Sequence, residues 1–297
     1  MTLQQTIDEY LIEQQIRGNS DKTIIYYKRC LRMFQEFLKK QQIESTEEIT
    51  QGHCKGYYFE LKQQGNRTST TIQTYIRAIR AFLSWCYTEG YIAENIPARF
   101  KLPKAQRKTI DVLTEGEIKR LMACFDTRDR IGLRNYCICA LMLDSGLRLN
   151  EVVTLESGNV HIAEGYIIVN GKGDKQRIVP LGLQSKKSLI RYCASTPKRA
   201  EKTPLFEKDT LTPLKQSTVK QLFRKLKIKA DIPRLRPHLL RHSFATRYLE
   251  NGGDIYSLQM ILGHTSLEMV KRYVHLTSAK TVVNFARFSP LDNILKQ

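Results

Sequence analysis

The stretch "YIIVNGKGDKQRIVPL", Tyr166 to Leu181, decides the fold class of this 297-residue chain. Two runs rich in β-branched residues, 166–169 and 177–181, flank a Gly-rich turn, which is the pattern of a β-hairpin. The chain on both sides of it has helical patterns instead. We therefore expect a mainly α-helical fold with a small β-sheet or hairpin, divided between a helical domain and a mixed α/β domain, as the chain length also suggests.

The N-terminal part of the chain is expected to form a helical domain over residues 1–95. Apolar residues recur there at helical spacing over 24–38 and again over 72–83. The segment "IPARFKLPKAQRKTIDVL", 96–113, has two prolines, five basic residues and no apolar stripe, which indicates an extended interdomain linker. Basic side chains attract backbone phosphates, and the linker residues that we expect to contact DNA are Lys101, Lys104, Arg107 and Lys108.

The second domain is expected to span residues 114–297. It opens with Thr114 and Glu117, which have the spacing of a capping box ahead of the apolar residues of a helix. The hairpin lies inside this domain, and its turn carries Lys172 and Lys175. From residue 214 onward the pattern is helical again, so this domain is expected to be helical around one small sheet.

The charge of the chain indicates a polyanionic partner. The formal net charge is +19 and the pI is near 9.7, a balance typical of proteins that bind nucleic acid. Residues 1–103 hold 14 Lys and Arg against 11 Asp and Glu, which leaves 34 against 18 for residues 104–297. The seven cysteines are scattered and include no C-x-x-C pair, and the sequence shows neither a signal peptide nor an apolar run that could span a bilayer. We expect a cytoplasmic protein that acts on DNA and not on a membrane.

The stretch "RPHLLRHSFATRYL", 236–249, pairs His238 with Arg241 at the start of a helix behind a proline. Leu240, Phe244 and Tyr248 mark its apolar stripe, so His238 and Arg241 are expected on neighbouring, less buried positions where both could meet one ligand. On their own, the histidine could simply cap the helix and the arginine could be solvated. Further residues elsewhere in the domain favour a shared ligand.

Arg148 follows a Gly turn and precedes Glu151 by three residues, so the carboxylate could orient the arginine as a phosphate clamp. An ordinary helical ion pair has the same spacing. A lysine of the hairpin turn could protonate a departing alkoxide, and composition does not choose between Lys172 and Lys175.

In "ILGHTSLEMVKRYVHL", 261–276, His264 precedes a second capping-box pattern, and the helix that follows presents Tyr273. His264 could donate to a phosphate oxygen, and the Tyr273 hydroxyl could attack phosphorus. Two arginines, a lysine, two histidines and a tyrosine, with no carboxylate cluster for magnesium and no P-loop motif, indicate phosphoryl transfer without metal or cofactor.

Four segments carry a resemblance to a known family: "SGLRLNEV", "GKGDKQRIVPLG", "HLLRHSFAT" and "LGHTSLEMVKRYVH". In order and spacing they resemble the tyrosine recombinases, also called the phage integrase family, and the resemblance covers nearly the whole chain. It implies a helical core-binding domain followed by a mixed α/β catalytic domain. It also aligns the first lysine of the family's hairpin motif with Lys172, which leaves Lys175 as a DNA contact.

The resemblance implies a role for each candidate. Tyr273 would attack the scissile phosphate to form a 3′-phosphotyrosyl link, and Arg148 and Arg241 would hold the non-bridging oxygens. Lys172 would protonate the leaving 5′-oxygen, and His238 would assist deprotonation of Tyr273. His264 would bind the phosphate, while Glu151 would support Arg148.

The resemblance further implies partners and a biological setting. Four protomers would assemble on two double-stranded DNA recombination sites and exchange strands through a Holliday junction, with an accessory protein or a sister recombinase as further partners. The compact two-domain form resembles Xer-like recombinases and the integrases of mobile elements, so either resolution of DNA multimers or integration and excision of a mobile element is expected. Two alternatives stay open from the sequence: a type IB topoisomerase-like nicking and closing enzyme, and a non-catalytic DNA-binding protein.

Overall fold

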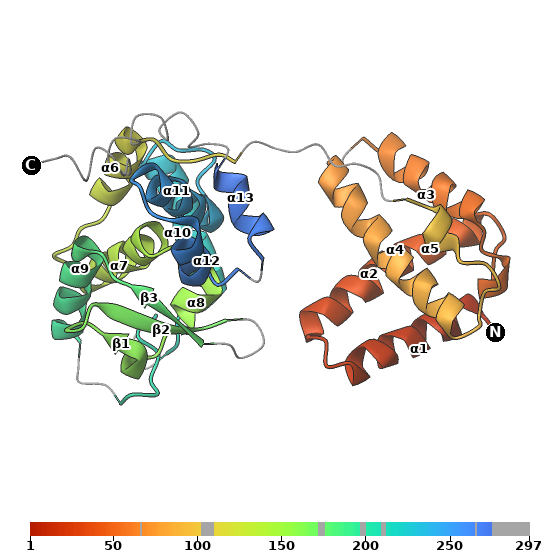
Figure 1. The fold of residues 1–297 in the computed structure, drawn as a ribbon, viewed down its shortest axis with the longest axis horizontal. Coiled ribbons are helices and arrows are strands. Elements are labelled where there is room, and N and C mark those ends of the chain that lie inside the picture. The colour runs from red at the N-terminus through yellow and green to blue at the C-terminus, as the bar shows by residue number, and fades with distance from the viewer. Residues whose placement is uncertain are drawn as a thin grey trace, which may run out of the picture. The chain divides into compact units, whose positions relative to one another are not determined.

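The structure of the protein is a computed structural model that describes residues 1–65, 67–101, 110–171, 176–196, 200–208, 212–264 and 266–274. The chain forms two compact units, Met1–Lys108 and Thr109–Gln297 (Figure 1). Both are mainly helical, and the second contains a small three-stranded sheet. The predicted fold class is therefore confirmed. Within the ranges given above, no helix is both long enough and apolar enough to cross a membrane.

The N-terminal unit is a bundle of helices around an apolar core. Two predicted helical segments lie in its two longest helices, α2 and α4, whose buried faces carry Phe34 and Leu38 on one and Ile76 and Phe82 on the other. The elements of this unit are α1 (Leu3–Ile16), α2 (Asp21–Lys40), the 3₁₀ turn η1 (Thr46–Glu48), α3 (Gln51–Gln63), α4 (Ser69–Thr88) and α5 (Ile96–Arg99).

The C-terminal unit combines its sheet with eight helices of the described chain. Thr114 caps the first of these, α6, in the predicted capping box, because its hydroxyl accepts from Glu117 N–H while the Glu117 carboxylate accepts from Thr114 N–H. The elements are α6 (Glu115–Ala123), α7 (Arg130–Asp144), α8 (Leu149–Val153), η2 (Ser157–Asn159), β1 (Val160–His161), β2 (Tyr166–Asn170), β3 (Gln176–Pro180), α9 (Leu183–Ala194), α10 (Gln216–Lys229), α11 (Pro237–Glu250), α12 (Ile255–Leu262) and α13 (Glu268–Val274).

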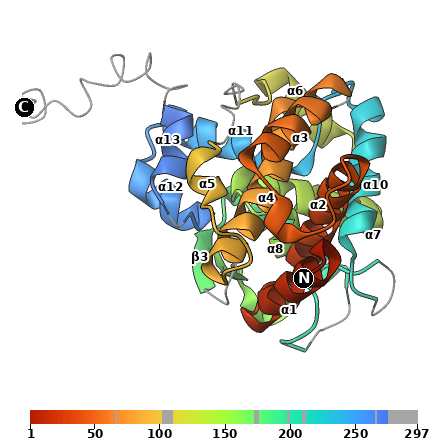
Figure 2. The ribbon, with the colours of Figure 1, turned by 90° about the vertical axis from the view of Figure 1, so that its right-hand side faces the viewer.

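The predicted hairpin is the pair β2 and β3, which run antiparallel from Tyr166 opposite Pro180 to Asn170 opposite Gln176. The sheet has one strand more than expected, since the two-residue strand β1 pairs with β2 on its other edge. Helix α11 crosses the middle of the unit, where α7, α12 and α13 pack against it (Figures 1 and 2). This central helix carries the "HLLRHSFAT" segment.

Both ends of the predicted linker, 96–113, differ from that expectation. Residues 96–99 form α5, and Ile96 is buried in the core of the N-terminal unit. At the other end Leu113 is fully buried in the C-terminal unit, where its N–H donates to the hydroxyl of Ser243 at 2.8 Å. Apolar side chains therefore anchor each end. The linker residue Lys101 is exposed, while Lys104, Arg107 and Lys108 lie outside the described residues.

Candidate active site

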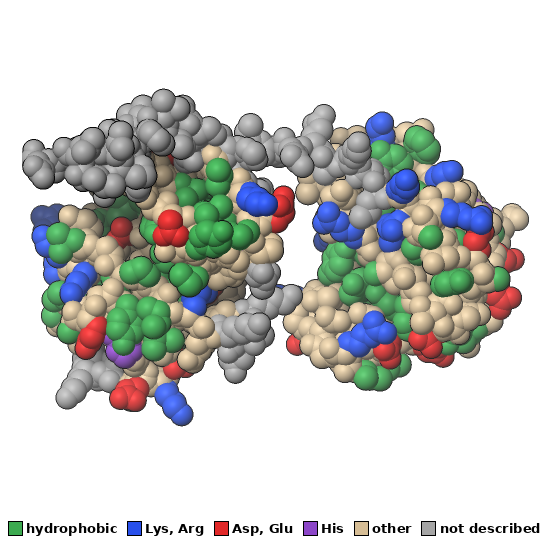
Figure 3. All heavy atoms as spheres, in the orientation of Figure 1, with side chains coloured by type: hydrophobic (Ala, Val, Ile, Leu, Met, Phe, Trp, Pro, Cys, Tyr) green, Lys and Arg blue, Asp and Glu red, His purple; other side chains and the backbone are tan. Residues whose placement is uncertain are grey.

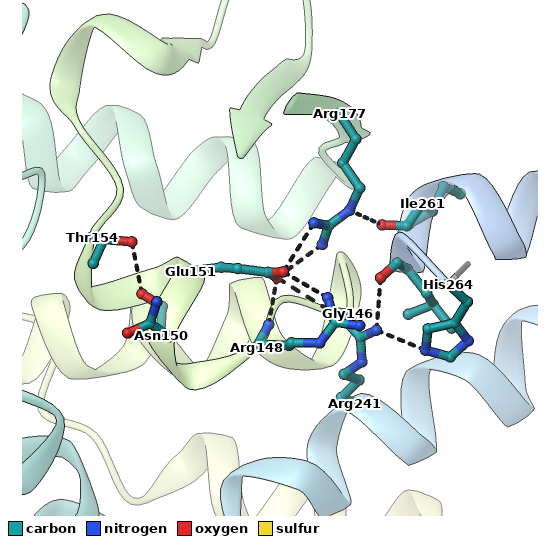
Figure 4. A network of polar contacts seen from close by, with 10 residues as sticks. Gly146, Arg148, Asn150, Glu151, Thr154, Arg177, Arg241, Ile261 and His264 are labelled. Atoms are coloured by element: carbon teal, nitrogen blue, oxygen red, sulfur yellow. Dashed lines mark hydrogen bonds and ion pairs between the residues drawn. The ribbon is translucent and has the colours of Figure 1, made fainter. Parts of the chain in front are cut away.

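A single buried carboxylate, that of Glu151, organises the site (Figure 4). Its two oxygens accept from Arg148, one from the backbone N–H and one from Nη1, both at 2.8 Å. They also accept two parallel bonds from Arg177 on β3, at 2.9 and 2.8 Å. Glu151 thus holds Arg148 at the start of α8, where a third of the arginine side chain, 34%, stays exposed to solvent. We call Arg148, Glu151, Arg177 and Arg241 the arginine cluster.

Arg241 is buried, with 5% of its surface exposed, so its predicted place on a less buried side of the helix is wrong. Because α11 is packed on several sides, its polar face points into the protein. The guanidinium donates to the carbonyl oxygens of Gly146 at 2.6 Å and Leu262 at 2.7 Å, and it lies 4.0 Å from a Glu151 oxygen. Burial, and then the charge of Arg148, lower the Arg241 pKa to about 9.

His264 completes this side of the cluster. It follows Gly263, which ends α12 in the left-handed conformation with φ of 61°. Its Nε2 lies 3.0 Å from Nη2 of Arg241, and because a guanidinium can only donate, Nε2 is the acceptor. The structure therefore brings together four of the candidate residues, Arg148, Arg241, His264 and Glu151, and their roles stay predictions.

His238 lies at the exposed first turn of α11, one turn ahead of Arg241. Desolvation by neighbouring atoms, followed by the charges of Arg241, Arg148 and Arg236, lowers its pKa. The imidazole is consequently neutral at pH 7. A neutral imidazole beside an anion site can accept a proton.

Tyr273 lies on α13, and only 3% of its surface is exposed. The ring packs in a small apolar cluster with Leu258 and Leu262 of α12 and Val270 of its own helix. Its hydroxyl is hydrogen-bonded to Nδ1 of His242 at 2.7 Å. His242 stands one turn beyond the predicted partner, His238, on the same helix.

The two hairpin lysines, Lys172 and Lys175, lie outside the described residues. What the structure describes of the hairpin is its stem, which extends to Asn170 opposite Gln176. The stem places the residue after Gln176, Arg177, against Glu151.

Sequence reasoning missed two residues of this region, Arg177 and His242. A signal existed for each. Arg177 is two residues from the buried Val179, so both lie on the inward face of β3, and an arginine there indicates a carboxylate partner. His242 is four residues from His238, the spacing of neighbours on one helical face.

Comparison with known proteins identifies the family that the sequence motifs resemble. The phage integrase family model matches residues 111–280, and the model of the phage integrase N-terminal SAM-like domain matches residues 7–90. Among curated proteins, the tyrosine recombinase XerD of Staphylococcus aureus is 32% identical over 290 residues, which cover 96% of this chain and 98% of that protein.

Solved structures of recombinases share the fold. A XerA recombinase is 28% identical, with a TM-score of 0.52 over 97% of this chain and 99% of that one. A lambda integrase tetramer bound to a Holliday junction is 19% identical, with a TM-score of 0.72 over 90% of this chain and 78% of that one.

Proposed function

The chain belongs to the phage integrase family and is a site-specific tyrosine recombinase, and from that premise we propose that Arg148 and Arg241 of the arginine cluster bind the scissile phosphate while Tyr273 attacks it. The oxygen of Tyr273 forms a bond to phosphorus, and the bond from phosphorus to the 5′-oxygen breaks. The product is a 3′-phosphotyrosyl link and a 5′-hydroxyl. Attack by another 5′-hydroxyl reverses the step and rejoins the strand.

The charge of the arginine cluster is the observation that carries this proposal. Three guanidinium groups share one carboxylate, so the cluster holds two uncompensated positive charges. A phosphodiester has one negative charge, and attack by a phenolate brings a second. The cluster therefore matches the charge of the transition state, and preorganised donors of this kind contribute about 3–4 kcal/mol each.

Protons move through the remaining residues. Neutral His238 accepts the phenolic proton of Tyr273, and its lowered pKa supports that role. We assign protonation of the leaving 5′-oxygen to Lys172 of the hairpin turn. His264, oriented by its contact with Arg241, binds a phosphate oxygen.

The hydroxyl of Tyr273 is not available to a DNA phosphate while the ring is 3% exposed and bonded to His242. Attack therefore requires α13 to shift when DNA binds. Exposed apolar residues lie on the same helices, Tyr256 and Met260 on α12 and Met269 on α13, and hydrophobic side chains gather over these helices in Figure 3.

DNA contacts are proposed along the basic linker and on the N-terminal unit. Lys101, Lys104, Arg107, Lys108 and Lys175 are the residues proposed to bind phosphates. Figure 3 shows Lys and Arg side chains spread over the face of the N-terminal unit that it presents. Two of the arginines of this unit, Arg29 and Arg67, lie over the ring of Tyr75, each 5.6 Å from its centroid, a geometry that holds guanidinium groups ready for phosphate.

The proposed assembly is a homotetramer on two recombination sites in the cytoplasm, with an accessory protein or a sister recombinase where the sites require one. The proposed biological role is resolution of DNA multimers or integration and excision of a mobile element. The comparisons do not favour the topoisomerase-like or non-catalytic alternatives.

The test of this function is recombination between two copies of a bound site on one supercoiled plasmid, in EDTA. Sites would first be obtained by selecting genomic fragments that the protein binds. Recombinant circles that require Tyr273 are the expected product. Relaxed plasmid without recombinants would instead indicate a nicking and closing enzyme, and intact plasmid would indicate a DNA-binding protein without catalysis.

A further inference from the structure

Arg177 contributes charge to the arginine cluster, but the proposed chemistry gives it no contact with the phosphate. It lies on β3, two residues beyond Lys175, and 11% of its side chain is exposed. Both Nη groups donate to Glu151, and Nε donates to the carbonyl oxygen of Ile261 at 2.7 Å (Figure 4). With all three nitrogens engaged by the protein, Arg177 is placed to hold other groups and not to bind DNA.

Those bonds join three separate elements. Glu151 carries Arg148 at the start of α8, and Ile261 belongs to the last turn of α12. The next glycine, Gly263, fits closely over Arg177: a Cβ at Gly263 would lie 2.9 Å from Cδ of the arginine. His264 follows at once and contacts Arg241. One guanidinium thus sets the position of a strand, a helix start and the turn that delivers His264.

The charge of Arg177 also acts on Glu151. Burial by itself would raise the pKa of this carboxyl, but hydrogen bonds and charge from Arg177, followed by bonds from Arg148, lower it below its usual value. Glu151 is thereby kept ionised among the groups that face it, which are Arg148, Arg177 and Arg241. His264 is hydrogen-bonded to Arg241 and is thereby linked to these charged groups.

We propose that Arg177 is a positioning residue for strand cleavage: it fixes the Glu151 carboxylate that aims Arg148, and it fixes the end of α12 from which His264 meets Arg241. The inference rests on the proposed function of the cluster. Arg177 itself does not touch the phosphate. Replacing Arg177 should slow the cleavage of bound DNA and leave DNA affinity nearly unchanged.

A simpler role as a structural ion pair has a matched control in the same unit. Arg234 also donates from two Nη groups to one carboxylate, Glu117, and to a backbone carbonyl, that of Val112. Asp111 is its second acidic partner. Arg234 therefore offers the same interactions without any contact to the cluster residues among its bonds. Replacing each arginine in parallel separates loss of an ion pair from loss of positioning.

The experiment measures covalent adduct formation under single-turnover conditions on a nicked suicide DNA, with DNA affinity measured by gel shift. For Arg177→Gln we expect the rate at saturating protein to fall at least tenfold and the dissociation constant to change less than threefold. The rate of Arg177→Lys should fall less, because lysine keeps the positive charge although it cannot form the two parallel bonds. Arg234→Gln and Arg234→Lys should stay within twofold of the wild-type rate.

The pH dependence of the rate distinguishes positioning from folding. Burial raises the pKa of Glu151, and Arg177 counteracts this effect in the wild type. In Arg177→Gln the pKa should therefore be higher, and the carboxyl should take up a proton at a higher pH than in the wild type. A protonated Glu151 holds Arg148 less well, so the rate of Arg177→Gln should fall more steeply than that of the wild type as the pH is lowered from 8 toward 5. The other titratable groups are the same in both proteins, so the ratio of the two rates is the quantity to compare.

The outcomes are distinct. A wild-type rate in Arg177→Gln, or an equal loss in Arg234→Gln, would overturn the inference while leaving the proposed function intact. A wild-type protein that binds DNA and forms no adduct would overturn the proposed function, and this inference with it.

Discussion

Two arginine–carboxylate groups in the C-terminal unit use the same chemistry with opposite charge balance. Around Arg234, one guanidinium meets two carboxylates, Asp111 and Glu117. In the arginine cluster, three guanidinium groups meet one carboxylate, Glu151. The first group has one excess negative charge, which water can solvate because Arg234 and Asp111 are partly exposed, whereas the second has a largely buried positive excess that an anion would relieve. A buried surplus of charge, and not the presence of ion pairs, is therefore what marks a site.

The largest expected effect comes from removing the carboxylate of each group. Glu151→Gln leaves three buried or half-buried arginines without a counter-charge, so the free energy of unfolding should fall by about 3 kcal/mol. Glu117→Gln leaves Asp111 in place and should cost about 1 kcal/mol or less. Urea unfolding followed by circular dichroism measures both, and fluorescence of Trp85, the only tryptophan of the chain, reports the N-terminal unit as an internal reference.

Equal losses of unfolding free energy in the two variants would show that the surplus charge of the cluster has no energetic consequence. A loss in Glu117→Gln greater than in Glu151→Gln would reverse the comparison.

A smaller effect is expected at Tyr273, whose hydroxyl is hydrogen-bonded to His242. A hydrogen bond contributes about 1 kcal/mol, so His242→Ala should raise the population of displaced α13 about fivefold. Tryptic cleavage of the native protein after Lys271, whose side chain is exposed, should accelerate by a similar factor. The matched control is His161→Ala, since His161 also packs on a tyrosine ring, that of Tyr166, at 4.6 Å between centroids.

An unchanged cleavage rate in His242→Ala would mean that the apolar packing of Tyr273 alone holds α13. The same acceleration in His161→Ala would show that the effect is not specific to the nucleophile.

Local chemistry explains why much of the fold was predictable from the sequence. The hairpin follows from a Gly-rich turn between two β-branched runs, and the start of α6 follows from the capping box of Thr114 and Glu117. The short strand β1 has no such signal, because two residues pair with β2 only once the rest of the unit has folded.

The site also combines local contacts, which the sequence predicts, with long-range contacts, which it does not. The pairing of Arg148 with Glu151 is local, three residues apart, and the structure contains it. Other hydrogen bonds of the site join segments that are 21 to 95 residues apart. These are the bonds of Arg241 to Gly146 and Leu262, of Arg177 to Glu151, and of Tyr273 to His242. Periodicity describes one helix at a time, so it placed Arg241 on an exposed side of α11 that the packing of α7, α12 and α13 removes.

The central claim is that Tyr273 becomes covalently linked to DNA while Arg148 and Arg241 hold the phosphate. The most direct test is to incubate the protein with a nicked suicide substrate in EDTA, separate covalent adducts on a denaturing gel, and identify the DNA-linked peptide by mass spectrometry. We expect an adduct on Tyr273 that Tyr273→Phe abolishes and that Arg241→Gln slows about 100-fold or more. An adduct on another residue, or none on DNA that the protein binds, would contradict it.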